Sequence, residues 1–198
     1  MKKLLVLLTV LCMIWAMAAC DPLPNAVTGE EEEPPVPEAE MILPENGYAE
    51  GFLGDGMRTA FFDFVVNDAY LTGEYEGYTP SEGYTLLVTN VTVYNYTDYS
   101  VTMFDTDFQT QWNDASDDAF AVPVTYERDG YPNTGVKAAG DMLEGEYTVG
   151  IRQSARGDLV FQVPEGQVDF SISYQEYYDR EEDPYGDLFF VYFTPEMR

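Results

Sequence analysis

The residues whose types and spacing come closest to a metal site are acidic and lie near the carboxyl end. They share one loop with Gly186: Asp179, Glu181, Asp183 and Asp187. Calcium takes several oxygen ligands from a flexible loop, so these carboxylates are candidate calcium ligands. The loop is not an EF-hand, because Phe190 stands at the twelfth position, where a glutamate closes that site. The alternative is a solvated acidic loop that keeps strand edges unpaired.

No residue set points to catalysis. The sequence has no histidine, the commonest general base and transition-metal ligand, and no GxSxG, Walker, HExxH or CxxC pattern. A hydrolase built on paired carboxylates stays open as a third function, but 36 Asp and Glu residues make any single pair unspecific. We therefore expect a protein that is not an enzyme, with no catalytic residue and no cofactor except the calcium of the acidic loop.

Cys20 is a candidate for lipidation. It ends the run Met17-Ala18-Ala19-Cys20, which resembles a bacterial lipobox and follows two lysines and an apolar stretch. Residues 1–19 thus predict a lipoprotein signal peptide, because the apolar stretch is shorter than the roughly 20 residues of a membrane-spanning helix. Cleavage after Ala18, which would release a soluble protein, is the competing interpretation.

Lipidation would fix the location of the protein. A diacylglyceryl group on the Cys20 sulfur supplies two acyl chains (palmitate is an example), and two chains hold a protein stably on a membrane. We expect export and anchoring on the outer face of the bacterial cell membrane, facing the extracellular side. The other cysteine, Cys12, leaves with the signal, so no internal disulfide can form and a hydrophobic core must hold the fold.

Composition divides the rest of the chain into a tether and one domain. Residues 20–47 combine repeated prolines with the run Glu30-Glu31-Glu32-Glu33 and predict an extended, disordered tether. Residues 48–198 have the length of one domain. The formal net charge of -27 disfavours nucleic acid and anionic lipid surfaces as partners.

The domain reads as short strands separated by turns. Period-two alternation is clearest over 84–94, 104–112 and 168–174, and other strands are expected at 60–66, 119–126, 147–151, 159–163 and 188–193. Pro123 suggests an edge position for its strand. About eight strands without a convincing amphipathic helix predict an all-β fold, an antiparallel immunoglobulin-like β-sandwich. A closed barrel is the alternative.

Three segments resemble an uncharacterised domain family of secreted or lipid-anchored bacterial proteins. They are the strand Gly83-Tyr84-Thr85-Leu86-Leu87-Val88-Thr89-Asn90-Val91-Thr92-Val93-Tyr94-Asn95, the turn Leu143-Glu144-Gly145-Glu146, and the strand Leu159-Val160-Phe161-Gln162-Val163-Pro164. The resemblance covers roughly residues 58–178. It implies an immunoglobulin-like sandwich and an exported location, and the family has no general activity to transfer. This chain has Glu144 where proline is usual and a longer stretch between Gly145 and Phe161.

Tyrosines in predicted loops and at strand ends supply a candidate binding surface. They are Tyr75, Tyr78, Tyr96, Tyr99, Tyr131, Tyr177, Tyr178 and Tyr185. Such positions on a sandwich often carry binding residues. The alternative is that the tyrosine rings pack at strand ends and leave their hydroxyl groups exposed to solvent. We expect a non-catalytic binding or interaction module for an unidentified protein or polysaccharide. The alternative is a structural, calcium-stabilised envelope component. The oligomeric state is left open.

Overall fold

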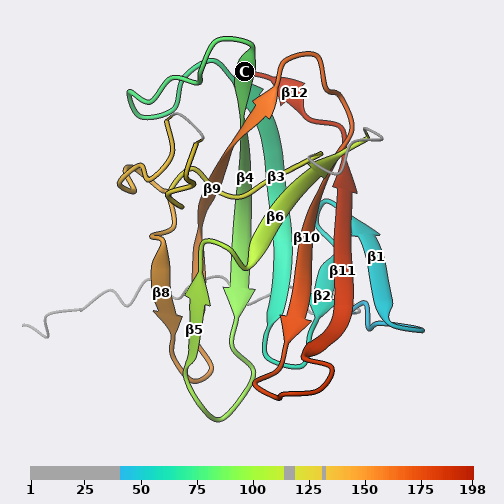
Figure 1. Ribbon diagram of the computed structural model, residues 1–198. Coiled ribbons are helices and arrows are strands. Elements are labelled where there is room, and N and C mark those ends of the chain that lie inside the picture. The colour runs from blue at the N-terminus through green and yellow to red at the C-terminus, as the bar shows by residue number, and fades with distance from the viewer. Residues whose placement is uncertain (1–40, 114–118, 131–132) are drawn as a thin grey trace, which may run out of the picture. The chain divides into compact units, whose positions relative to one another are not determined.

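The computed structural model describes residues 41–113, 119–130 and 133–198, which all belong to one compact unit, Pro34–Arg198 (Figure 1). These residues form strands and loops, without a helix. Accordingly, the described part of the chain offers no helix long and apolar enough to cross a membrane. The predicted signal peptide, Cys20 and residues 20–40 of the predicted tether lie outside the described residues.

Two larger sheets and a separate strand pair make up the fold. The β11 sheet has the order β1-β11-β10-β6-β7, formed by Tyr48–Phe52, Tyr185–Phe193, Phe170–Tyr177, Phe108–Trp112 and Phe120–Ala121. The β4 sheet has the order β12-β3-β4-β9, with β2 also on β3, formed by Glu196–Met197, Asp63–Thr72, Tyr84–Tyr94, Ser154–Pro164 and Gly56–Arg58. The separate pair joins β5 (Val101–Phe104) to β8 (Glu146–Val149).

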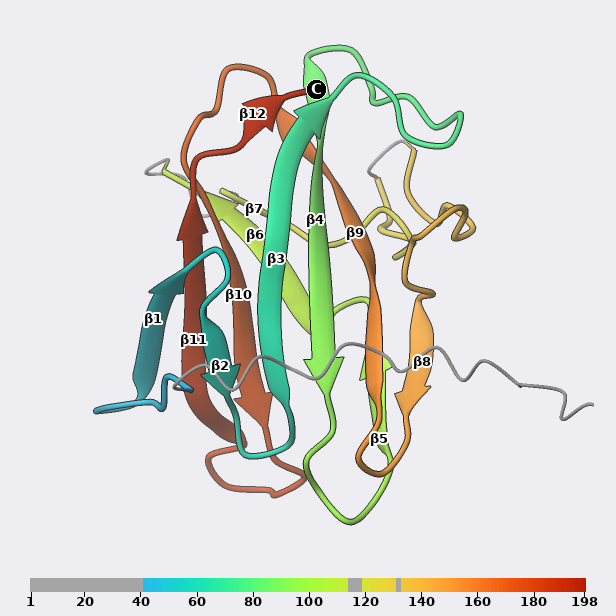
Figure 2. The ribbon, with the colours of Figure 1, turned by 180° about the vertical axis from the view of Figure 1, so that it is seen from behind.

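The main core lies between the two larger sheets, which face each other as layers in Figure 2. Alternate residues of the strands point into this core, and many of them are aromatic. The Phe64 ring lies 5.3 Å from that of Phe108 and 6.2 Å from that of Phe189, in edge-on arrangements that aromatic pairs favour. The predicted β-sandwich is thereby confirmed.

A second, smaller core lies on the other side of the β4 sheet. Leu86, Val88 and Val160 alternate with core residues such as Leu87, and they are fully buried under the loop residue Val124. The amide of Val124 donates to the carbonyl of Val160 at 2.8 Å, which fixes this loop on β9. The outer face of the β4 sheet is therefore covered by the chain itself.

Several strands match their predictions. β4 spans the predicted 84–94, β9 and β11 contain the predicted 159–163 and 188–193, and β10 covers the predicted 168–174 from Phe170 on. β7 is an edge strand, as Pro123 suggested, but it is only two residues long. β1, β2 and β12 were not predicted, and β1 and β12 pair in parallel with β11 and β3, so the sheets are mixed rather than wholly antiparallel.

The single strand predicted over 104–112 is wrong. The chain turns at Asp107, whose amide donates to the Phe104 carbonyl and whose carboxylate accepts from the Phe104 amide at 2.7 Å. β5 and β6 consequently lie in different sheets. The alternation of apolar and polar residues continues through the turn, which is why periodicity alone did not reveal it.

Contacts of the domain begin before β1. The Ile42 amide donates to the Gly56 carbonyl at 2.8 Å, and the Arg58 amide donates to the Ile42 carbonyl at 3.0 Å. The Ile42 side chain packs against the main core. Ile42 lies within the range expected as tether, so a part of that range contributes to the domain.

Candidate ligand-binding site

The outer face of the β11 sheet carries three rows of side chains that cross its strands. Strand register aligns Phe52, Tyr192, Ser171 and Gln111 in the first row, Glu50, Phe190, Ser173 and Gln109 in the second, and Tyr48, Leu188 and Gln175 in the third. Their neighbours along each strand belong to the main core, so these residues must point away from it. We call this set the aromatic–amide face.

The first two rows share one arrangement. In the first two rows β11 supplies an aromatic ring, β10 a serine and β6 a glutamine, and β1 adds Phe52 or Glu50; the third row has Tyr48, Leu188 and Gln175. Ser171 and Ser173 are only 5% and 4% exposed, because they are small and taller side chains flank them on β11 and β6. The serines thus form the floor of the face, the side chains of β11 form its aromatic wall, and the glutamines of β6 form its amide wall.

Hydrogen bonds hold the amide wall and the floor together. The Gln111 Nε2 donates to Ser173 Oγ, and this hydroxyl donates to the Gln109 carbonyl, both at 3.4 Å. These are long bonds, close to the limit of useful geometry. Side-chain amides both donate and accept, so a polar ligand can replace such bonds with its own.

The aromatic wall is ordered by stacking and by one carboxylate. The rings of Phe190 and Tyr192 are nearly parallel, at 13°, with centroids 5.9 Å apart. The Tyr192 hydroxyl donates to Glu50 Oε1 at 3.0 Å. Partial burial, and then this bond, raise the pKa of Tyr192 above its ordinary value, so the hydroxyl stays protonated at neutral pH.

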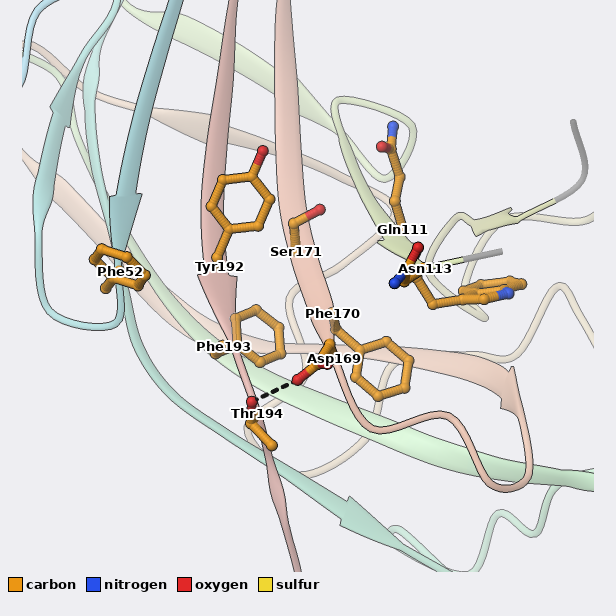
Figure 3. Close-up of a pocket in the computed structure, with 10 residues that line it drawn as sticks. Phe52, Gln111, Asn113, Asp169, Phe170, Ser171, Tyr192, Phe193 and Thr194 are labelled. Carbon is orange, nitrogen blue, oxygen red and sulfur yellow. Dashed lines mark hydrogen bonds between the residues drawn. The ribbon is translucent and has the colours of Figure 1, made fainter. Parts of the chain in front are cut away.

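A pocket of about 600 Å³ lies at the end of the first row (Figure 3). Figure 3 shows Tyr192, Ser171 and Gln111 side by side, with Asn113 and Asp169 at the mouth. The Thr194 hydroxyl donates to Asp169 Oδ1 at 2.7 Å. All four residues of the first row line the pocket, and Asn113, Asp169 and Thr194 add polar groups to it.

The face carries no positive charge. None of the residues in its three rows is lysine or arginine, and none of the described pocket-lining residues is either. Glu50 and Asp169 are acidic. An anionic ligand would meet repulsion here without a compensating cation.

The structure does not gather the predicted calcium ligands. Asp179, Glu181 and Asp183 are exposed, Asp187 is half-buried, and the described residues contain no group of three or more His, Cys, Asp or Glu side chains placed to hold a metal ion. The sequence has a second acidic turn, at Asn113, Asp114, Asp117 and Asp118, of which the structure describes only Asn113, an exposed residue. Calcium binding stays a prediction, tested by melting the full chain with calcium and then with chelator, beside Asp183→Asn.

A buried carboxylate organises the base of that acidic loop. Glu176 is 2% exposed and accepts from the Ala60 amide at 2.7 Å, the Tyr178 hydroxyl at 2.8 Å and the Asp187 amide at 3.2 Å. Three donors satisfy a buried carboxylate that would otherwise destabilise the fold. We assign Glu176 to structure, because its oxygens are committed to these bonds.

The predicted tyrosine surface is divided among several places. Tyr177 and Tyr185 form a pair with ring centroids 6.0 Å apart, 63% and 60% exposed. Tyr75, Tyr78 and Tyr96 donate to Asp158, Asn133 and Thr59 respectively. Tyr178 packs on Phe61 at 5.2 Å, Tyr99 is exposed in a loop, and Tyr131 lies outside the described residues.

Sequence reasoning missed most of the aromatic–amide face. The alternation in β6 and β10 had placed Gln109, Gln111, Ser171 and Ser173 on a water-facing side, without a function. The aromatic wall was missed because β1 was not predicted and β11 read as a uniform apolar run. A uniform run does not show which residues face outward.

Comparisons with known proteins give a fold-level likeness at most. No protein-family model and no curated protein matches this sequence. The chain is similar to the "putative lipoprotein" YcdA of Bacillus subtilis, with 17% identity and a TM-score of 0.48 over 69% of this chain, and it spans 38% of that protein's chain.

Two further solved structures show the same level of similarity. One is a "putative lipoprotein" of Staphylococcus aureus, with 12% identity and a TM-score of 0.47, covering 74% of this chain and 94% of that one. The other is an uncharacterized β-sandwich protein of Clostridium difficile 630, with 11% identity and a TM-score of 0.40, covering 82% of this chain and 100% of that one. These neighbours are bacterial lipoproteins or β-sandwich proteins without an assigned function, like the family that the sequence resembles. At these TM-scores they supply no residue roles for this chain.

Proposed function

We propose that this protein is a lipid-anchored module of the bacterial cell surface that binds a ligand on its aromatic–amide face without converting it. One observation carries the proposal. The face places rings, two low-lying serines and two glutamines in register across four strands, and its first row lines a pocket. Exposed aromatic groups beside a few convergent polar groups are typical of binding sites.

Binding is favoured over hydrolysis by the carboxylates of the site. Among the described residues that line the pocket, Asp169 is the one acid, and Thr194 donates to it. Glycoside hydrolysis normally needs two carboxylates on opposite sides of the scissile bond. The described lining has no such pair, which favours a site that holds its ligand unchanged.

Anchoring rests on the sequence around Cys20. An acylated Cys20 would keep the domain at the membrane surface, with the acidic, proline-rich segment between them. The test is metabolic labelling of the full chain with a palmitate analogue in an expressing bacterium. The wild type should carry the label and fractionate with membranes. Cys20→Ser should lose both properties, and an unlabelled wild type in the medium would refute the anchor.

Binding is tested with cells that display the full chain. Labelled cell-envelope extract should bind to these cells, and Tyr192→Ala should weaken that binding at least about tenfold, as expected for an aromatic hot spot. Tyr99→Ala is the matched control, since Tyr99 is 51% exposed and lies outside the face. Equal binding by both variants would reject the aromatic–amide face as the site.

A further inference from the structure

We infer that the ligand of the aromatic–amide face is an uncharged glycan chain lying along β10 across the rows of that face. The inference rests on the proposed function and adds the ligand's chemical class. It follows from three properties of the face: its charge, its repeated rows and the kind of hydrogen-bonding groups that it exposes.

Charge restricts the ligand first. The chain has 9 Lys and Arg against 36 Asp and Glu, and neither the rows of the face nor the described residues of the pocket include a cation. The acids Glu50 and Asp169 each accept from a neutral hydroxyl, at 3.0 and 2.7 Å. These carboxylates can also accept from hydroxyl groups of a ligand, whereas phosphate, sulfate or uronate groups would be repelled.

The repetition of the rows indicates an extended ligand. The first two rows place a ring, a serine and a glutamine in the same order, one step apart along the strands. Along β10 the two serines are flanked by the larger side chains of β11 and β6. Further exposed rings lie beside Tyr192, at Phe52 on β1, and beyond the third row, at the pair of Tyr177 and Tyr185. A polymer of similar units matches repeated subsites better than a compact molecule does.

The hydrogen-bonding groups favour a sugar over a peptide. Extended peptides are bound chiefly through main-chain groups at a free sheet edge. Here β10 is paired on both sides, by β11 and β6, so its main chain is already committed to the sheet. What remains are side-chain amides and hydroxyls, which donate and accept equally well, as sugar hydroxyls do. A pyranose ring also has an apolar C–H face, and the nearly parallel rings of Phe190 and Tyr192 give that face a surface to pack on.

The test is affinity electrophoresis of the full chain, extracted in detergent from an expressing bacterium. The gels contain hydroxyethyl cellulose, laminarin or galactomannan, and polygalacturonate serves as the anionic comparison. We expect retardation by at least one neutral polysaccharide and none by polygalacturonate. Tyr192→Ala and Gln111→Ala should each weaken retardation at least about tenfold, while Tyr99→Ala leaves it unchanged. Unchanged melting of the variants shows that they are folded.

A second arm replaces these polysaccharides with protein-free cell walls of the expressing bacterium. It separates a glycan of the cell's own envelope from a glycan of the surroundings. If every glycan fails but an envelope extract still binds through Tyr192, and protease treatment of the extract abolishes that binding, the ligand is a protein. That outcome overturns the glycan and leaves the proposed function standing. If Tyr192→Ala changes no binding in either experiment, both are refuted.

Discussion

The two outer faces of this sandwich differ in what lies on them. On the β4 sheet, Leu86, Val88 and Val160 are covered by the chain's own loop at Val124. On the β11 sheet no loop of residues 41–113, 119–130 or 133–198 covers the aromatic wall in this way, and Tyr192 and Phe52 are 37% and 68% exposed. Both faces carry large apolar groups, so hydrophobic content alone does not distinguish them.

Polar groups show the same contrast. On the β4 face, Asn90 donates to Asp158 at 2.7 Å and accepts from Arg156 at 2.8 Å, while the Tyr75 hydroxyl donates to Asp158 at 2.9 Å. On the β11 face the glutamine and serine bonds are longer, at 3.4 Å. The chain satisfies the first face internally and leaves the second with groups that a ligand can satisfy. Internal satisfaction indicates a structural role, and its absence indicates a binding role.

The largest expected effect is the loss of a side chain under the covered face. Leu86 is fully buried, and Leu86→Ala should lower the free energy of unfolding by about 2–5 kcal/mol. Leu188→Ala is the matched change on the open face, where a half-buried leucine should cost about 1 kcal/mol. Denaturant unfolding measures both. Equal losses would show that the two faces do not differ as described.

A smaller loss is expected from the polar network of the covered face. Tyr75→Phe removes the hydroxyl that donates to Asp158 at 2.9 Å, and a hydrogen bond to a charged group contributes about 1.5 kcal/mol or more. Tyr177→Phe, on the exposed pair, should change stability by less than about 0.5 kcal/mol. The same unfolding experiment compares the two variants. If only Tyr177→Phe lowered the free energy of unfolding, the Tyr75 hydroxyl would not have the structural role assigned to it.

Tyr192→Ala should separate binding from stability. Its ring is partly exposed, so truncation should cost no more than about 1 kcal/mol of stability while weakening ligand binding at least about tenfold. Thermal melting measures the change in stability and affinity electrophoresis measures the change in binding, both on one preparation. A large fall in melting temperature would mean that Tyr192 supports the fold, and the aromatic wall would then lose its assigned role.

The smallest effect is expected at alkaline pH. Burial, and then the bond to Asp158, raise the pKa of Tyr75, whereas an unfolded tyrosine titrates at about 10. The folded chain holds this proton more tightly, so the stabilisation is present below about pH 10 and is lost as pH rises through the folded pKa. Solvent screening keeps the effect small. Between about pH 8 and about pH 10.5, Tyr75→Phe should lose less stability than the wild type, and an equal loss would contradict this contribution.

Local sequence signals were enough to predict the fold class. Period-two alternation gave β4 its bounds, and the turn residues separated most of the other strands. The same alternation separates Ser171, Ser173 and the β6 glutamines from the core residues beside them, although the two serines are buried among their neighbours. These inferences succeeded because a strand with one buried face must alternate, wherever it lies in the fold.

Only the tertiary structure decided which outer face stays open and which side chains meet on it. The aromatic–amide face depends on the parallel pairing of β1 with β11 and on the turn at Asp107 that moves β6 into the β11 sheet. The pattern of alternating apolar and polar residues predicts neither the strand pairing nor the chain reversal. The rows join residues as distant in the chain as Phe52, Gln111 and Tyr192, and only strand register brings them together. Register is set by packing of the whole core and by turn geometry, so the site could not be assembled from any one segment.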